Sequence, residues 1–207
     1  MPLQCGIVGL PNVGKSSIFN ALTRSSVPAD NYPFCTIDPH LGIVELPDVR
    51  LLELQKIYKP EKVIASTVEF IDIAGLVKGA SSGEGLGNQF LSQIRQTSAI
   101  IHVVRCFDDK NINHVDGMID PIKDIGIIET ELLLSDIDTL EKRKTKLQKV
   151  IKSRKKDDLA ALDLVENLIQ HCSSGKNAKT FKATNYMSAF RKSLHLLTDK
   201  PMLYVGN

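Results

Sequence analysis

The chain has 207 residues, of which 43% are hydrophobic and 24% are charged, and its 26 Lys and Arg nearly balance its 24 Asp and Glu. This composition excludes a disordered or collagen-like chain. Because positive and negative charges nearly balance, the net charge does not indicate a nucleic acid or a membrane as the main partner. The longest apolar run, residues 99–106, is far shorter than a membrane span. We expect a cytoplasmic monomer that does not bind membranes.

The first half of the sequence predicts strands that alternate with helices. Residues 3–8 form a short apolar run, which is followed by a loop and then by a helical pattern that begins at Lys15. Further strands are predicted at residues 43–46, 68–73 and 100–106, and helices at 48–60, where Asp48 is the expected cap, and at 84–96. This order predicts a doubly wound α/β fold with a mostly parallel sheet.

The second half predicts a helical insertion. After residue 122 the apolar residues recur at the spacing of a coiled-coil seam, at Leu133, Ile137, Leu140, Leu147 and Ile151. The polar run 153–158 predicts a turn, and strand character returns near Met202. We therefore expect a nucleotide-binding core of residues 1–122 and 198–207, into which residues 123–197 insert an antiparallel helical hairpin. The basic stretch 141–160 either meets RNA phosphates or forms a solvated surface with internal ion pairs.

The loop after the first strand carries a phosphate-binding motif. Gly9-Leu-Pro-Asn-Val-Gly-Lys-Ser16 matches the pattern G-x-x-x-x-G-K-[ST], in which backbone N–H groups and a helix N-terminus converge on phosphate oxygens. Lys15 is expected to bridge β- and γ-phosphate oxygens, and the Ser16 hydroxyl to ligate Mg²⁺. The alternative is a glycine turn with a surface lysine. The predicted nucleotide-binding residues of this segment are Asn12, Val13, Gly14, Lys15, Ser16 and Ser17.

Two further segments extend this site. Asp72-Ile-Ala-Gly75 has the form D-x-x-G at the end of a predicted strand, which places Asp72 beside the metal and the Gly75 N–H at the γ-phosphate. Thr36 lies where nucleotide switch proteins carry a threonine that contacts Mg²⁺ when the γ-phosphate is present, with a surface threonine as the alternative. Leu76 occupies the position of the glutamine that orients the attacking water in Ras-type enzymes. Another group or a partner must then hold this water.

The chain closely resembles the YchF family of Obg-related P-loop NTPases in five blocks, at residues 9–16, 31–37, 72–80, 83–90 and 102–107. The resemblance implies a Ras-like P-loop core with an inserted hairpin. It also implies a switch protein that binds ATP in preference to GTP and slowly hydrolyses it to ADP and phosphate. Association with the ribosome or ribosomal RNA and a downstream TGS domain belong to the same expectation.

The resemblance assigns roles to three more residues. His114 matches a loop histidine suggested to hold the attacking water, with a plain surface histidine as the alternative. Asn12 resembles an asparagine that binds K⁺ in related NTPases, with a turn-forming asparagine as the alternative. Asn207 matches the start of the family's base-reading motif N-x-x-E, and the chain stops there. We therefore expect a fragment with incomplete base recognition, in which ATP preference rests on the resemblance alone.

Other functions remain open at this point. A signalling module that binds nucleotide but hydrolyses it negligibly is compatible with Leu76. A GTP-specific Obg-type GTPase would carry the same phosphate-binding motif. A small-molecule kinase would also need an acceptor pocket and an arginine-rich lid, neither of which the sequence shows clearly.

Overall fold

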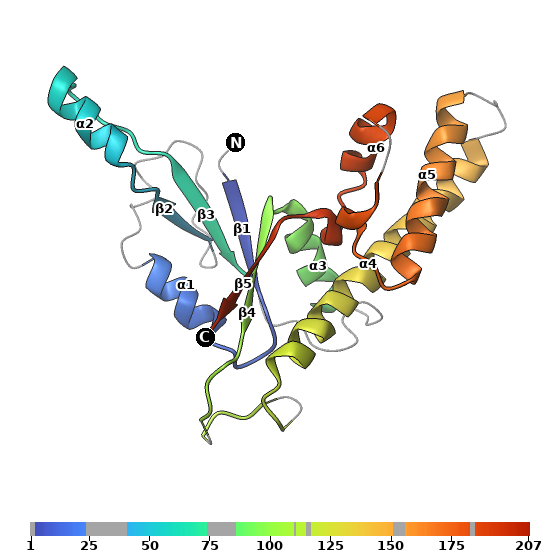
Figure 1. The fold of residues 1–207 in the computed structure, drawn as a ribbon, viewed down its shortest axis with the longest axis horizontal. Coiled ribbons are helices and arrows are strands. Elements are labelled where there is room, and N and C mark those ends of the chain that lie inside the picture. The colour runs from blue at the N-terminus through green and yellow to red at the C-terminus, as the bar shows by residue number, and fades with distance from the viewer. Residues whose placement is uncertain are drawn as a thin grey trace.

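The computed structural model describes residues 3–23, 41–73, 86–109, 111–114, 117–150, 156–182 and 185–207. Its centre is a five-stranded sheet in the order β2-β3-β1-β4-β5 (Figure 1). The strands are β1 (Leu3–Val8), β2 (Leu41–Glu45), β3 (Thr67–Asp72), β4 (Ala99–Val104) and β5 (Met202–Gly206). Only β2 pairs antiparallel with its neighbour among these strands. The predicted α/β fold with a mostly parallel sheet is confirmed.

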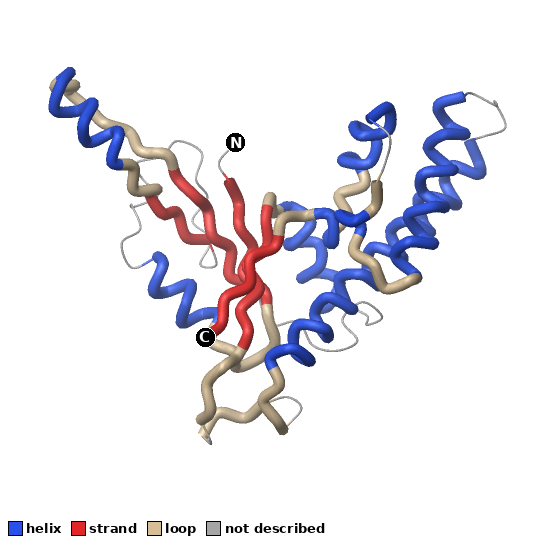
Figure 2. Tube along the Cα trace, in the orientation of Figure 1, coloured by secondary structure: helices blue, strands red, loops and turns tan. Residues whose placement is uncertain are grey.

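Three helices follow strands in the first half of the chain. They are α1 (Lys15–Thr23), α2 (Val49–Tyr58) and α3 (Leu86–Gln96). In Figure 2, α1 lies on one side of the strands and α3 on the other, and the last four residues of β1 are buried between these layers. The predicted start of α2 is confirmed, because the Asp48 side chain accepts a hydrogen bond from the Arg50 N–H.

The insertion is built on two long helices, α4 (Pro121–Val150) and α5 (Lys156–Ser173), which lie side by side in Figure 1. Their apolar faces form a second core, which includes Leu140, Leu147, Leu164, Val165 and Leu168. The predicted turn at 153–158 is wrong over its last three residues, which are helical. Asp157 and Asp158 stabilise this first turn of α5, because their negative charges lie at the positive end of the helix dipole.

The helix α4 belongs to both cores. Ile128 and Leu132 are fully buried in the cluster that contains Ile7, Ile100 and Val103 of the sheet. Two turns farther on, Leu140 packs in the second core. The boundary predicted at residue 122 therefore assigns to the insertion several α4 residues that pack against the sheet.

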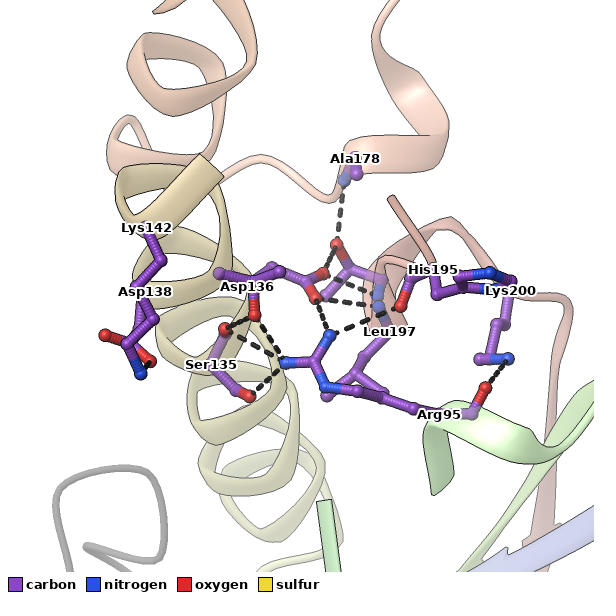
Figure 3. A network of polar contacts seen from close by, with 11 residues as sticks. Arg95, Ser135, Asp136, Asp138, Lys142, Ala178, His195, Leu197 and Lys200 are labelled. Atoms are coloured by element: carbon purple, nitrogen blue, oxygen red, sulfur yellow. Dashed lines mark hydrogen bonds and ion pairs between the residues drawn. The ribbon is translucent and has the colours of Figure 1, made fainter. Parts of the chain in front are cut away.

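The chain returns to the sheet through short helices, η3 (Ala178–Thr180), η4 (Asn185–Met187), α6 (Ser188–Ser193) and η5 (Leu197–Asp199). A buried carboxylate fixes this return (Figure 3). Asp136 of α4 is fully buried and accepts hydrogen bonds from the Leu197 N–H at 2.7 Å, the Thr198 N–H at 2.8 Å and the Thr198 hydroxyl at 2.7 Å. Burial raises the pKa of Asp136, while these donors oppose the shift.

Arg95 ties the same junction to α3. Its guanidinium donates to the Ser135 hydroxyl at 2.8 Å, to the Thr139 hydroxyl at 2.7 Å and to the His195 carbonyl at 3.3 Å. Lys200 Nζ in turn donates to the Arg95 carbonyl at 3.0 Å. The sheet, α3 and the inserted hairpin are therefore joined at one polar junction. Among the described residues, no helix is long and apolar enough to cross a membrane.

Candidate phosphate-binding site

The loop between β1 and α1 can be built only with its two glycines. Gly14 has φ of +93°, and a Cβ there would lie 2.2 Å from Asn207 Nδ2. A Cβ on Gly9 would lie 2.4 Å from the Val103 carbonyl oxygen. The side chain of Val13 is buried in the core, whereas Asn12, Ser16 and Ser17 are exposed. The loop thus lies at the carboxyl end of β1, which runs between β3 and β4, where parallel sheets bind ligands.

Lys15 begins α1 and lies inside the curve of this loop. Its Nζ donates to the Leu10 carbonyl at 2.8 Å, and the side chain is buried. Burial lowers the pKa of Lys15, while the carboxylate of Asp72 opposes that shift. The helix N-terminus and the lysine therefore concentrate positive charge at one place, which suits an anion.

Ser16 and Asp72 meet beside the lysine. The Ser16 hydroxyl donates to Asp72 Oδ2 at 2.9 Å, and Asp72 is the last residue of β3. Asp72 Oδ1 is buried and has no hydrogen-bond partner among the described residues. A hydroxyl and a carboxylate with an unused oxygen fit Mg²⁺, which prefers oxygen ligands and completes its shell with water and phosphate.

Asn207 connects the end of β5 to the loop. Its Nδ2 donates to the Val13 carbonyl at 2.9 Å, and its backbone N–H donates to the Val104 carbonyl at 2.9 Å. The Asn207 carbonyl accepts from the Cys106 N–H at 2.8 Å. The side chain therefore fixes the loop that would hold the phosphates.

A second loop, described at residues 105–109 and 111–114, lies against the first. Buried Arg105 donates to the carbonyls of residues 107, 109 and 112, at 3.0 to 3.2 Å. Asn12 Nδ2 donates to the Asn113 carbonyl at 3.2 Å. The next residue, His114, is not a surface histidine: its Nε2 lies 2.9 Å from Asp124 Oδ2, and the two side chains are 4% and 3% exposed.

The structure therefore brings together six of the predicted residues, which are Asn12, Val13, Gly14, Lys15, Ser16 and Asp72. Ser17 and Asn207 adjoin them, and His114 lies in the loop that contacts Asn12, next to Asn113. Thr36, Gly75 and Leu76 lie outside the described residues. Sequence reasoning missed the structural roles of Arg105 and Asp124. The available signal for Arg105 was a charge inside an apolar run, whereas Asp124 gave none.

His102 is a buried neutral histidine under the site. It lies on β4, its ring centroid is 5.6 Å from that of Tyr204, and its Nδ1 has no hydrogen-bond partner among the described residues. Burial and the positive charge of Lys15 lower the pKa of His102 from 6.5 to about 4. The charged form of His102 is thus unfavourable in the folded protein.

This histidine predicts a loss of stability in weak acid. Between pH 6.5 and about 4 the unfolded chain binds a proton at this position and the folded chain does not, so the free energy of unfolding falls as the pH falls. A shift of this size corresponds to a loss of up to about 3 kcal/mol. Urea titrations at pH 7 and pH 4.5 should show a smaller loss for His102→Leu than for the parent. Equal losses in both proteins would contradict the prediction.

Comparison with known proteins gives a consistent set of relatives. The family model described as "50S ribosome-binding GTPase" matches residues 4–207. The chain is 53% identical to "Ribosome-binding ATPase YchF" of Bacillus subtilis and 49% identical to that of Escherichia coli O157:H7, in each case over all of this chain and 57% of the relative. The "Structure of the Schizosaccharomyces pombe YchF GTPase" matches with a TM-score of 0.82 and 42% identity, over 99% of this chain and 56% of that one.

Proposed function

Because this chain belongs to the 50S ribosome-binding GTPase family, and within it to the YchF proteins, we propose that it binds ATP at residues 9–16 and slowly hydrolyses it to ADP and phosphate. The observation that carries the proposal is the meeting of Lys15, Ser16 and Asp72 at the carboxyl ends of β1 and β3. The chain spans 57% of the length of these two curated relatives, so the activity is proposed for this part of the protein.

The loop supplies binding and positioning. Backbone N–H groups of residues 13–16 face the β-phosphate, and Lys15 exchanges its contact with the Leu10 carbonyl for phosphate oxygens. Ser16 and Asp72 would hold Mg²⁺, which neutralises charge that develops on the phosphates. In this proposal the Gly75 N–H contacts the γ-phosphate, and Thr36 contacts the metal.

The proposed base selectivity for ATP can be tested directly. Fluorescence titration of this chain with labelled ATP and labelled GTP, each with Mg²⁺, measures both affinities. Tighter binding of ATP would show that residues 1–207 carry the selectivity. Equal binding would remove ATP preference from the proposal for this chain and favour a nucleotide site without base discrimination.

The partner we propose is the ribosome, in line with the names of the relatives. The hairpin's basic stretch supports this only in part, because several of its cations have partners within the hairpin. Lys142 pairs with Asp138 at 2.6 Å and Lys144 with Glu166 at 3.2 Å. Lys146 and Lys149 are exposed. Cosedimentation with ribosomes in ATP and in ADP, followed by single-turnover hydrolysis with and without ribosomes, distinguishes a stimulated enzyme from a signalling module with negligible turnover.

We further propose that His114 orients the attacking water, since Leu76 cannot. His114→Ala should then lower kcat by about a hundredfold, the usual size of a lost acid–base or water-orienting group, and leave nucleotide affinity unchanged. Single-turnover hydrolysis and the titration above measure the two quantities. His171→Ala is the matched control, because His171 bonds to Asn177 and Thr180 of the hairpin instead.

An unchanged kcat in His114→Ala would exclude this role. The same assay tests the proposed K⁺ site. Asn12 donates through Nδ2 to Asn113, so its amide oxygen is the atom that would ligate K⁺. Equal turnover in K⁺ and in Na⁺ would exclude that site.

A further inference from the structure

We propose that Asp124, in the first turn of α4, holds His114 turned into the protein, so that hydrolysis requires this pair to open. The inference rests on the role proposed above for His114. It makes Asp124 a positioning residue, and it makes the beginning of the inserted helix α4 part of the control of turnover.

The side chains of His114 and Asp124 are in close contact and are shielded from solvent. His114 Nε2 and Asp124 Oδ2 are 2.9 Å apart, and the side chains are 4% and 3% exposed. Hydrogen bonds that involve a charged group are about twice as strong as neutral ones, and exclusion of water strengthens them further. The ring therefore has a defined orientation, directed at α4 and away from solvent.

Asp124 is not needed to begin the helix. That function belongs to Asp120, whose Oδ1 accepts from the Lys123 N–H at 3.1 Å, as an N-terminal cap does. The second carboxylate oxygen of Asp124, Oδ1, is buried without a hydrogen-bond partner among the described residues. A buried carboxylate with an unused oxygen costs stability. The hydrogen bond to His114 offsets part of this cost, so the folded protein favours the closed contact between the carboxylate and the ring.

Three contacts among the described residues help to fix the loop that carries His114. Arg105 donates to its carbonyls, Asn12 of the phosphate-binding loop donates to Asn113, and Asp124 of α4 contacts His114. The neighbouring residue, Asn113, thus already touches the phosphate-binding loop. Rotation of the ring out of its contact with Asp124 is the change that His114 needs to reach a water molecule.

The first test measures how accessible the His114 ring is when Asp124 is present or replaced, and it does not depend on hydrolysis. Diethyl pyrocarbonate modifies accessible imidazoles, and peptide mass spectrometry reads the rate at His114. Asp124→Ala should raise this rate about tenfold or more, since a lost charged hydrogen bond shifts a local equilibrium by at least that factor. Asp124→Asn, which keeps the size and one acceptor oxygen, should give an intermediate rate. Asp120→Asn is the matched control and should leave the rate unchanged.

The second test reads turnover. Because only the fraction of molecules with a released ring can use His114, Asp124→Ala should raise kcat about threefold or more without changing KM, and the rise should disappear in the background of His114→Ala. Unchanged labelling of His114 in both Asp124 variants would overturn the proposal. A fall in kcat would also overturn it, because Asp124 would then orient His114 for catalysis. If His114→Ala alone leaves kcat unchanged, the proposed role of His114 fails, while the labelling result still decides whether Asp124 holds the ring.

Discussion

Replacing Lys15 with alanine should lower the affinity for ATP about a hundredfold and remove measurable hydrolysis, since each charged hydrogen bond to a phosphate contributes about 1.5–3 kcal/mol. The loop curves around Nζ, which is held by the Leu10 carbonyl, so the cation is positioned before the phosphates arrive. Burial already penalises the charge of Lys15, and its removal should leave the free energy of unfolding unchanged within about 1 kcal/mol. Fluorescence titration with Mg²⁺ and single-turnover hydrolysis measure the first two effects.

Two variants sharpen this experiment. Lys15→Met keeps the aliphatic stem and should behave like Lys15→Ala, which would assign the loss to the ammonium group. Lys56→Ala removes an exposed lysine of α2 that pairs with Glu53, and it should change neither quantity. If Lys15→Ala binds ATP as tightly as the parent, the phosphate site is not at this loop.

Replacing Asp136 with alanine should lower the free energy of unfolding by about 3–5 kcal/mol, the usual cost of removing one partner from a buried charged network. The substitution leaves the N–H groups of Leu197 and Thr198 buried without their acceptor and removes the partner of the Thr198 hydroxyl. It also leaves the nearby Arg95 guanidinium without its closest carboxylate, at 4.0 Å. Urea unfolding followed by circular dichroism measures the effect.

Asp138→Ala is the matched control, two residues farther along the same helix. Its carboxylate is 58% exposed and pairs with Lys142, which is 71% exposed, so water screens the pair. We expect a change of no more than about 0.5 kcal/mol. Equal losses for Asp136→Ala and Asp138→Ala would mean that the buried junction does not hold the hairpin to the sheet.

The parts of the molecule that depend on local sequence were predictable. The phosphate-binding loop follows from a motif with a fixed spacing, the bounds of β1 from an apolar run, and the start of α2 from the capping residue Asp48. Each of these features is decided by residues within a few positions of one another, so the sequence alone contains the necessary information.

The polar contacts that join distant segments were not predictable. Asp136 resembles any acidic residue of an exposed helix, because its partners lie about sixty residues later in the chain. Asp124 and His114 are only ten residues apart, yet the angle between their loop and α4 decides whether they meet. The return of η5 and the packing of α4 on the sheet fix these geometries, and neither has a local pattern.

The continuous helix α4 is anchored near its middle by Asp136 and, in the half before it, by packing on the sheet. Asp136 and Ser135 anchor it to η5 and α3. Along the helix, Asp124 lies about 18 Å from Asp136 on the side of the phosphate-binding loop, and the other end lies about 21 Å away on the opposite side. Between Asp124 and Asp136, Ile128 and Leu132 pack in the core of the sheet, so this half of the helix is fixed to the sheet. The contact between His114 and Asp124 therefore links the loop beside the phosphate site to the half of α4 that belongs to the sheet, whereas the far half of the helix packs in the separate core of the hairpin.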